Sequence, residues 1–255
     1  MNIDTAVVLA AGEGKRLRPL TQNRPKPMLP AANRPILEYV LDELVDAGLH
    51  DLHLVVGYKR DRVQEYFGST YREASVTYHR QDKQLGSGHA LLQARSAIDS
   101  DFLVVNGDQL VSREIIDDVL DAHTVEEVAT LGVMESDRIA QYGAVTLGDG
   151  HVTQITEQAE SNAHGLLNAG VYVFAPSAFA EIEAMPRHQG ELSLPGAIEA
   201  LIEDGKPVRG VRTAGFWRDA TFPWDLLSLS EELLAHGHVT DTDMESDVPT
   251  SEASD

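Results

Sequence analysis

Short apolar runs alternate with amphipathic segments along the first half of the chain. The runs have the length and composition of buried strands, and they cover residues 5–11, 52–56, 75–79 and 102–106. Between them, apolar residues recur at helical spacing, which predicts helices over residues 33–48, 61–67 and 88–98. Asn33 can cap the start of the first helix and Gly48 its end. This alternation favours an α/β fold with a largely parallel sheet.

The second half of the chain contains strand-like segments that follow one another with fewer helices between them. They cover residues 127–134, 143–149, 151–157 and 168–174. We expect these strands to pair antiparallel and to cover the edge of the sheet. Late helices are expected over residues 195–205 and 222–237. We therefore expect one domain over residues 1–237, followed by an acidic, disordered tail over residues 238–255.

The net charge is strongly negative, and the acidic residues are dispersed. The 255 residues include 41 Asp and Glu against 20 Lys and Arg, for a net charge of −21, and the basic residues are 15 arginines and five lysines. This bias is typical of salt-adapted proteins, whose acidic surfaces stay hydrated; a specific electrostatic role is the alternative. Without a broad basic face, nucleic acid is not an expected partner.

The sequence contains no cysteine and no segment with the pattern of a membrane span. The absence of cysteine excludes disulfides and thiolate metal sites. No apolar run approaches the roughly 20 residues that span a bilayer, and the N-terminus lacks the pattern of a signal peptide. We expect a cytoplasmic protein with no membrane partner. The oligomeric state stays open, a homo-oligomer included.

Positive charge gathers in one segment near the N-terminus. Six basic residues and no acidic residue lie within residues 14–37. Gly12 and Gly14 follow the first predicted strand, where glycine lets backbone N–H groups approach phosphate oxygens. The segment matches neither the dinucleotide-binding fingerprint nor the P-loop. Prolines flank Lys26 and stiffen the loop around it. We therefore expect an anionic, phosphate-bearing ligand here.

The same segment carries a specific family resemblance. Residues 7–30, VVLAAGEGKRLRPLTQNRPKPMLP, closely resemble the signature of the sugar-1-phosphate nucleotidyltransferases, the nucleotide-sugar pyrophosphorylases. Matching segments continue to about Leu234; they are QLGSGHA, NGDQL, QYGAV, ITEQ, NAGVY, GELSLPGAIEAL and WRDATFPWDLL. The resemblance is to the short, single-domain members, and the glucose-1-phosphate thymidylyl- and uridylyltransferases are the nearest type.

The resemblance implies both a fold and a reaction. The fold is a Rossmann-like three-layer sandwich with a mixed, mostly parallel central sheet, the nucleotide-diphospho-sugar transferase fold. In the reaction, an NTP (UTP or dTTP) and a hexose-1-phosphate (glucose-1-phosphate first) give an NDP-sugar and pyrophosphate. Both substrates are polyanions, so the protein must align them and neutralise charge on the phosphates.

By resemblance, the basic loop supplies the catalytic cations. Arg16 would hold the leaving pyrophosphate through its planar guanidinium, and Lys26 would stabilise the α-phosphate or the sugar phosphate. The alternative is that both are exposed loop charges. Backbone donors of the glycines complete the nucleotide site, for which the resemblance implies Leu9, Ala11, Gly12, Gly14, Gln81 and Gly86.

Two aspartates are candidate ligands for Mg²⁺. Asp108, also a candidate catalytic residue, follows a predicted strand and a glycine, so we expect its carboxylate at the C-terminal edge of the sheet. Asp219 follows the tract GVRTAGFW. Two carboxylates with substrate phosphates suit octahedral Mg²⁺. Alternatively, Asp108 shapes a turn and Asp219 caps a helix.

Base and sugar recognition are also assigned by resemblance. Gln81 matches the position that reads the base, where its amide could accept from uracil N3–H and donate to O4. Guanine offers the same pair of groups, so the base stays open, and a solvated loop glutamine is the alternative. The implied sugar-binding residues are Tyr142, Gly143, Glu157, Gln158, Asn168 and Tyr172, the last of which could also be packing within its strand.

Gln158 departs from the family pattern. The family usually has a lysine here that contacts the sugar phosphate, and glutamine supplies no charge. The segment WRDAT also departs from the usual Asp-x-Gly-Thr, with Phe222 nearby. A non-catalytic, sugar-nucleotide-binding regulatory paralogue is therefore the alternative to an enzyme. Within the enzyme class, a mannose-1-phosphate guanylyltransferase and an enzyme that uses CTP with a phospho-alcohol are the alternatives.

Overall fold

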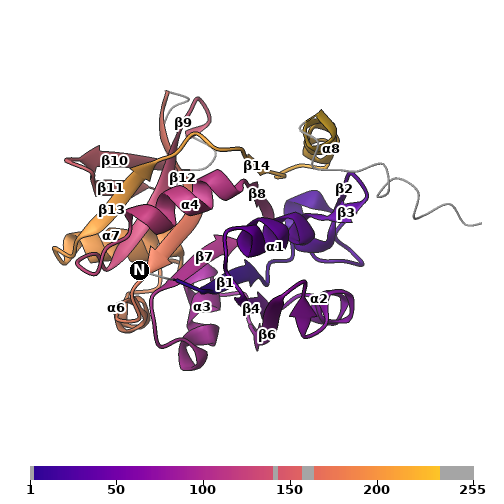
Figure 1. The fold of residues 1–255 in the computed structure, drawn as a ribbon, viewed down its shortest axis with the longest axis horizontal. Helices are drawn as coiled ribbons and strands as arrows, with labels where there is room; N and C mark the ends of the chain where they lie inside the picture. Colours follow the sequence, from indigo (N-terminus) through magenta and orange to yellow (C-terminus); the bar gives the residue numbers. More distant parts are fainter. Residues whose placement is uncertain (1–2, 140–142, 157–163, 236–255) are drawn as a thin grey trace, which may run out of the picture.

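A ten-stranded sheet crosses the whole molecule, with strand order β10-β11-β13-β9-β12-β7-β1-β4-β6-β5 (Figure 1). The computed structural model describes residues 3–139, 143–156 and 164–235. The strands of this sheet are β1 (Thr5–Ala10), β4 (Asp51–Val56), β5 (Thr70–Tyr71), β6 (Ala74–Arg80), β7 (Phe102–Asn106), β9 (Ala129–Ser136), β10 (Ala144–Gly148), β11 (His151–Thr156), β12 (Gly165–Phe174) and β13 (Val208–Arg212). The predicted tail, residues 238–255, lies outside the described residues.

The sheet is mixed rather than mostly parallel. Parallel pairing among the described strands is limited to the block β6-β4-β1-β7 and to the pair β9–β13. The long strand β12 runs antiparallel to both β7 and β9, and β10 and β11 form an antiparallel hairpin. The alternating strands and helices of the first half predicted the parallel block. The additional antiparallel pairs come mainly from the second half, where a short turn joins β10 to β11 and β12 lies antiparallel between β7 and β9.

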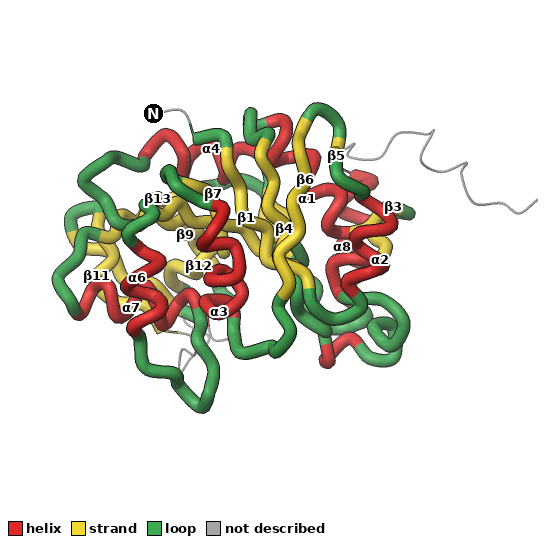
Figure 2. Tube along the Cα trace, turned by 90° about the horizontal axis from the view of Figure 1, so that it is seen from below, coloured by secondary structure: helices red, strands yellow, loops and turns green. Residues whose placement is uncertain are grey.

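Helices cover both faces of the sheet, which makes three layers. The α-helices are α1 (Ile36–Asp46), α2 (Arg60–Phe67), α3 (Ser87–Leu91), α4 (Arg113–Ala122), α6 (Ala178–Ala184), α7 (Leu194–Glu203) and α8 (Asp225–Ala235). Helices α1, α2 and α4 share one apolar core with the sheet, and α3, α6 and α7 share another. Figure 2 shows α3, α6 and α7 gathered on one side of the strands. The expected α/β three-layer arrangement is therefore confirmed.

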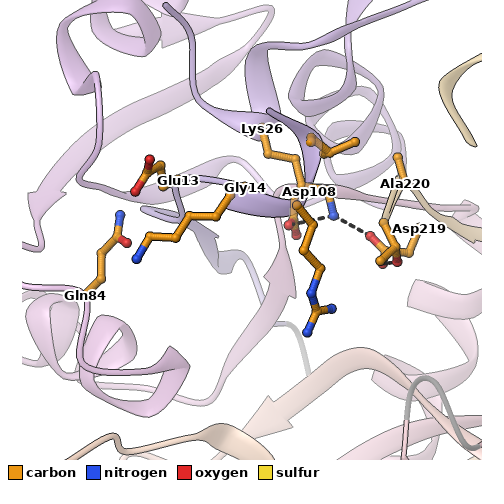
Figure 3. A pocket seen from close by; sticks show the side chains of 11 residues that line it. Glu13, Gly14, Lys26, Gln84, Asp108, Asp219 and Ala220 are labelled. Carbon is orange, nitrogen blue, oxygen red and sulfur yellow. Dashed lines mark hydrogen bonds and ion pairs between the residues drawn. The ribbon is translucent and has the colours of Figure 1, made fainter. Parts of the chain in front are cut away.

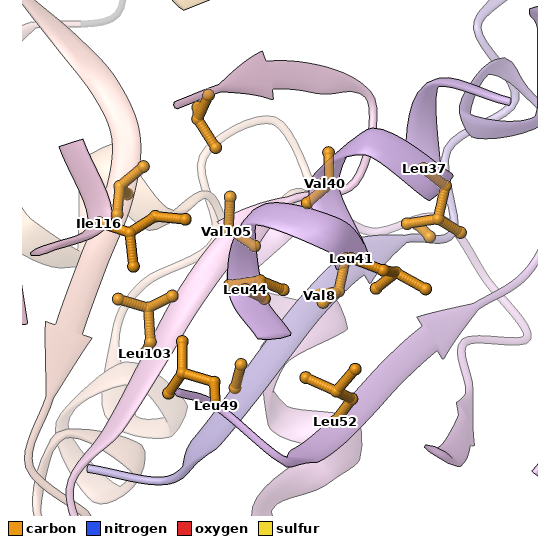
Figure 4. Packing of buried hydrophobic residues seen from close by; sticks show 14 of the residues in the cluster. Val8, Leu37, Val40, Leu41, Leu44, Leu49, Leu52, Leu103, Val105 and Ile116 are labelled. Carbon is orange, nitrogen blue, oxygen red and sulfur yellow. The ribbon is translucent and has the colours of Figure 1, made fainter. Parts of the chain in front are cut away.

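Strand β1 illustrates why the layers form. Its side chains alternate between the two faces, so Ala6 and Val8 belong to the core under α1, whereas Val7 and Leu9 belong to the core under α3. All four are at most 8% exposed. Figure 4 shows Val8 packed among Leu and Val side chains of α1 and the neighbouring strands. An apolar run without polar alternation is what a strand buried on both faces requires.

The first helix begins later than predicted, so the expected role of Asn33 was wrong. Helix α1 starts at Ile36, with Pro35 before it, and Asn33 lies in the tight turn between β2 (Pro30–Ala31) and β3 (Arg34–Pro35) with a φ of 71°. Asparagine tolerates this left-handed conformation well. Gly48 does end the helix, since its φ is 88° and its N–H donates to Val45 O at 2.9 Å.

Two other local features differ from the sequence prediction. The helix expected over residues 88–98 is a short α-helix, α3, that continues as the 3₁₀ helix η3 (Leu92–Ala97). Helix α4 was not predicted, although its buried Ile115, Ile116 and Val119 follow helical spacing. No helix among the described residues is long and apolar enough to cross a membrane.

Candidate functional site

A cleft opens where the loops after β1 and β7 leave the C-terminal edge of the sheet. Three adjoining cavities make up this cleft, and Asp108 lines all of them. Their volumes are about 330, 280 and 450 Å³. Figure 3 shows the first of these cavities, with Lys26 pointing between Asp108 and Asp219. This is the edge at which open α/β sheets generally bind ligands.

The loop after β1, which contains Gly12 and Gly14 and is called the glycine loop below, packs closely against the residues around Lys26. Gly14 has a φ of 68°, and a Cβ there would lie 2.7 Å from the Cβ of Lys26. Thr21 Oγ1 donates to the carbonyl of Gly14 at 3.0 Å. Gly14 therefore serves close backbone packing against the segment that carries Lys26, and a residue with a side chain would displace that segment. Among the described residues, Gly12 has no such neighbour within 4 Å.

Lys26 is held rigidly despite its charge. It starts the 3₁₀ helix η2 (Lys26–Met28), between Pro25 and Pro27, which fix the backbone on both sides. The residue is only 8% exposed. A lysine this deeply buried needs partners for its ammonium group.

Two aspartates from distant parts of the chain supply those partners. Strand β8 (Gln109–Val111) pairs antiparallel with β14 (Trp217–Asp219), and Asp219 lies opposite Gln109. This pairing puts Asp219 beside Asp108, the residue just before β8. The Nζ of Lys26 lies 2.5 Å from Asp219 Oδ1 and 3.0 Å from Asp108 Oδ2. The alternative helix-cap role for Asp219 is wrong, because Asp219 ends β14, before α8 (Asp225–Ala235) begins, and its carboxylate contacts Lys26 and Thr221.

The two carboxylates keep Lys26 charged. Burial alone would lower the pKa of Lys26, but Asp108 and Asp219 outweigh burial and hold that pKa above its ordinary value. Burial also raises the pKa of Asp219; Lys26 opposes this effect and Asp108 adds to it. Thr221 Oγ1 donates a further hydrogen bond to Asp219 Oδ2 at 3.0 Å. The cluster therefore combines one cation with two carboxylates.

Arg16 completes the positive side of the cleft. It lies in η1 (Lys15–Leu17), lines two of the three cavities and is exposed. Within the described part of the chain, no carboxylate lies within ion-pair distance of its guanidinium, whereas nearby Arg18 pairs with Glu13. An exposed, unpaired guanidinium at a cleft is suited to binding a phosphate.

The sequence-predicted nucleotide residues line one cavity, with the exception of Gly14, which lines the neighbouring one. The shared lining is Leu9, Ala11, Gly12, Gln81 and Gly86. Gln81 is buried, and its Nε2 lies 3.1 Å from Gly86 O and 2.9 Å from His89 Nδ1. With His89 accepting through Nδ1, both amide protons are engaged within the protein. The expected second role of this amide, donation to a base carbonyl, does not fit these contacts.

The sugar-binding prediction is only partly within the described residues. Asn168 and Tyr172 line the cavity that also contains Arg16, Lys26 and both aspartates. Asn168 donates to the Tyr172 hydroxyl at 2.6 Å, and the Tyr172 ring is also packed in the core.

The structure does not place the other four predicted sugar-binding residues in this cavity. Gly143 lies before β10, where its N–H donates to Ile139 O at 2.9 Å. Tyr142, Glu157 and Gln158 lie outside the described residues.

The polar residues of the cleft that were not predicted as site residues include Gln84, Asn106, Gln109 and Thr221. Gln84 donates to Ala11 O at 3.0 Å, and Asn106 donates to Gln109 Oε1 at 2.8 Å. Thr221 orients Asp219 through the hydrogen bond from its hydroxyl to Asp219 Oδ2. Asn106 and Gln109 flank the predicted Asp108, so their place at the end of a strand was an available signal. Gln84 and Thr221 lie in the segments QLGSGHA and WRDATFPWDLL, whose resemblance to the family was the available signal.

The donor set fits a hard divalent cation that also binds substrate. Two carboxylates reach the same ammonium group, so they converge on one point. The described residues contain no cluster of three or more acidic or histidine side chains that could hold a metal alone. Mg²⁺ characteristically uses one or two carboxylates together with water and substrate phosphates.

Comparison with known proteins identifies relatives along nearly the whole chain. The bifunctional protein GlmU of Methanococcus maripaludis strain C5 is 37% identical over 233 residues, which are 90% of this chain and 54% of that protein. This chain thus spans about half the length of such relatives. The UTP–glucose-1-phosphate uridylyltransferase AglF of Haloferax volcanii is 36% identical over 230 residues, 86% of this chain and 92% of that protein.

A comparison of the fold with solved structures also finds a similar protein. The structure of a UDP-glucose pyrophosphorylase complexed with UDP-glucose superposes with a TM-score of 0.82, covering 92% of this chain and all of that chain at 20% identity. The family described as nucleotidyl transferase matches residues 5–236. This chain, with its glycine loop and its Lys26–Asp108–Asp219 cluster, belongs to the nucleotidyl transferase family.

Proposed function

We propose that the protein is a sugar-1-phosphate nucleotidyltransferase that joins UTP or dTTP to glucose-1-phosphate, giving an NDP-glucose and pyrophosphate. The observation that carries this proposal is the buried Lys26 between Asp108 and Asp219, beside Arg16, which forms no ion pair with the described residues. Cations for phosphate and carboxylates for a metal lie on one cleft. The retained cluster argues against a regulatory paralogue, which would have no need for it.

The chemistry requires charge to be neutralised while one bond forms and another breaks. A phosphate oxygen of the sugar phosphate attacks the α-phosphorus, and the bond from that phosphorus to the bridging oxygen of the β-phosphate breaks. Arg16 would bind the pyrophosphate that carries away the released charge. Lys26 would turn its ammonium from the carboxylates towards the α-phosphate, where a point charge follows the moving group.

Asp108 and Asp219 are the residues that would hold Mg²⁺. When bound, Mg²⁺ supplies charge neutralisation and a template for the phosphate oxygens. The two aspartates have a second task without the metal, because they hold Lys26 charged and inside the cleft. Thr221 keeps Asp219 oriented for both tasks.

The choice of UTP or dTTP and glucose-1-phosphate rests on two supports. AglF, which is named a UTP–glucose-1-phosphate uridylyltransferase, matches this chain over 92% of its own length. Gln81 lines the cavity, and the contacts of its Nε2 leave the amide oxygen as an acceptor, which suits a base that carries an N–H group. Guanine also carries such a group, so GTP with mannose-1-phosphate belongs in the test.

The test is a matrix of UTP, dTTP, GTP and CTP against glucose-1-phosphate and mannose-1-phosphate, with MgCl₂ in molar KCl. Pyrophosphate release is measured for each pair. We expect UTP or dTTP with glucose-1-phosphate to give a kcat/KM at least about tenfold above the other pairs, a difference of about 1.4 kcal/mol. A folded protein that releases no pyrophosphate from any pair, yet binds UDP-glucose, would instead be a regulatory binding protein.

A further inference from the structure

Gln81 carries an amide whose orientation is fixed by its neighbours. Its Nε2 lies 3.1 Å from the carbonyl oxygen of Gly86 and 2.9 Å from Nδ1 of His89. A backbone carbonyl can only accept, so Nε2 rather than Oε1 must face Gly86. The second proton of Nε2 then points at His89. Both donors of the amide are used, and Oε1 remains as its only polar atom for a ligand.

The carbonyl of Gly86 is itself held in place. It also accepts the N–H of Ala90 at 3.1 Å, the first hydrogen bond of α3. Gly86 has a φ of 100°, and a Cβ at this position would lie 2.2 Å from Leu192 O. The Leu192 N–H in turn donates to Leu85 O at 2.8 Å. The acceptor that orients Gln81 is thus fixed by a helix and by the segment before α7.

His89 must accept through Nδ1 for this arrangement to hold. A histidine that accepts at Nδ1 is neutral and carries its proton on Nε2. Burial lowers the pKa of His89, and the positive charge of Arg187 lowers it further. Both effects favour the neutral ring. A proton on Nδ1 would oppose the N–H of Gln81 and drive the amide to turn.

The oriented amide has a consequence for nucleotide choice. Gln81 and Gly86 line the same cavity as Leu9 and Ala11. Within the described part of the chain, no donor is within hydrogen-bond distance of Gln81 Oε1. Uracil, thymine and guanine present a ring N–H to such an acceptor, whereas N3 of cytosine is an acceptor and would be repelled. This contact therefore separates UTP, dTTP and GTP from CTP.

We propose that His89 is a positioning residue that fixes Gln81 as a hydrogen-bond acceptor and thereby excludes cytosine from the nucleotide site. The inference rests on the proposed function, since it assumes that this cavity receives the base of an NTP. His89 acts through Gln81 and needs no contact with the base. Its helix, α3, is only five residues long, so the side chain and not the helix end carries the role.

Two substitutions of nearly equal size isolate the acceptor. In His89→Asn, Oδ1 stands three bonds from Cα, as Nδ1 does in histidine, and can accept from Gln81. In His89→Leu, a methyl group takes that position and accepts nothing. Steric and packing changes are similar in the two variants, so a difference between them reports the hydrogen bond. The readouts are kcat and KM for UTP and CTP with glucose-1-phosphate, and the Kd of each nucleotide by calorimetry.

We expect His89→Leu to lower the preference for UTP over CTP at least about tenfold, because the amide then keeps only its hydrogen bond to Gly86 O, and turning an N–H group towards cytosine N3 costs one internal hydrogen bond instead of two. The change should appear in KM, with kcat for UTP altered less than about threefold. His89→Asn should keep the preference within about threefold of the wild type. Equal preferences in the two variants would overturn the inference, and so would a His89→Asn variant that loses the preference.

The binding measurement separates this inference from the proposed function. A wild type that binds UTP better than CTP but releases no pyrophosphate would refute the proposed function alone, and the Kd ratios of the variants would still decide the role of His89. A wild type that turns over UTP while both variants keep its preference would refute the inference alone. Binding of neither nucleotide would refute both. If His89→Leu does not fold, loss of the preference in His89→Asn would still overturn the inference.

Discussion

The ammonium group of Lys26 lies 2.5 Å from Oδ1 of Asp219, a residue 193 positions further along the chain. It also lies 3.0 Å from Oδ2 of Asp108. One buried cation thus joins two carboxylates that would otherwise repel each other across the cleft. The same contact supports the fold and arranges the groups that the proposed reaction uses, so its removal has effects on both.

Substitution of Lys26 by methionine should reduce stability as well as activity. We expect Lys26→Met to lower the free energy of unfolding by about 1–3 kcal/mol, because two partly buried carboxylates lose the cation that they share. Urea denaturation at pH 7 measures the change. Adding Asp219→Asn should recover part of the loss, since it removes the repulsion with Asp108. A double variant that is less stable by the sum of both single losses would contradict this coupling.

The two aspartates should be needed for turnover. We expect Asp108→Asn or Asp219→Asn to lower kcat at least about a hundredfold, a barrier increase of about 2.7 kcal/mol, because an amide neither binds Mg²⁺ well nor holds Lys26. Pyrophosphate release under saturating substrates measures this. Asp121→Asn, at an exposed position on α4, is the matched control and should keep wild-type kcat. Near-wild-type turnover of both site variants would rule out the assigned roles.

Gly14→Ala should impair the site more than an alanine at another left-handed glycine. Gly205 has a φ of 70°, and no atom of the described residues lies within 4 Å of the position that its Cβ would take. Gly205→Ala therefore measures backbone strain alone, about 1 kcal/mol. At Gly14, the new methyl group would also meet the Cβ of Lys26 at 2.7 Å. We expect a larger stability loss and at least about a tenfold lower kcat/KM. Equal melting temperatures with full activity would show that the loop adapts freely.

The pH dependence of stability should include a step from a tyrosine network. Burial and a 2.6 Å hydrogen bond to Asp42 raise the pKa of Tyr71, and burial and Glu38 raise the pKa of Tyr66 to about 12. The folded protein therefore keeps phenol protons that the unfolded chain releases, so this contribution is present below about pH 10 and falls as pH rises from there.

The variant Tyr71→Phe tests the size of that step. It should be less stable than the wild type at pH 9, because the hydrogen bond to Asp42 is lost. Between pH 9 and pH 11, the wild type should lose more free energy of unfolding than Tyr71→Phe does. Urea denaturation at both pH values gives the comparison, and parallel losses would contradict the raised pKa.

Salt should stabilise the protein. With a net charge of −21, acidic residues repel one another in dilute buffer, and screening relieves this once the Debye length falls from about 10 Å at 0.1 M to about 3 Å at 1 M. We expect the melting temperature and the activity to be higher in molar KCl. Sodium sulfate and KCl compared at equal ionic strength separate screening from surface exclusion. A melting temperature that is the same at 0.1 M and 1 M KCl would exclude this effect.

Local patterns were enough to predict most elements of the first half, although not α4, and the chemical nature of the site. The apolar run of β1 and the helical spacing of α1 depend on residues close in sequence, so they can be recognised without the fold. The glycines, Arg16 and Lys26 lie in one continuous segment whose charge contrasts with the rest of the chain. Their gathering in one loop therefore needed no tertiary information.

The tertiary structure decided how distant residues meet. The pairing of β14 with β8 brings Asp219 beside Asp108, and nothing local in either segment specifies that register. Likewise, Asn33 has a left-handed backbone because it lies in the turn between β2 and β3, which precede α1 in the sequence, and it does not cap that helix. The orientation of the Gln81 amide depends on a carbonyl and an imidazole placed by α3. A sequence shows which groups are available, but hydrogen bonds and ion pairs act over about 3 Å, and only the folded chain sets distances on that scale.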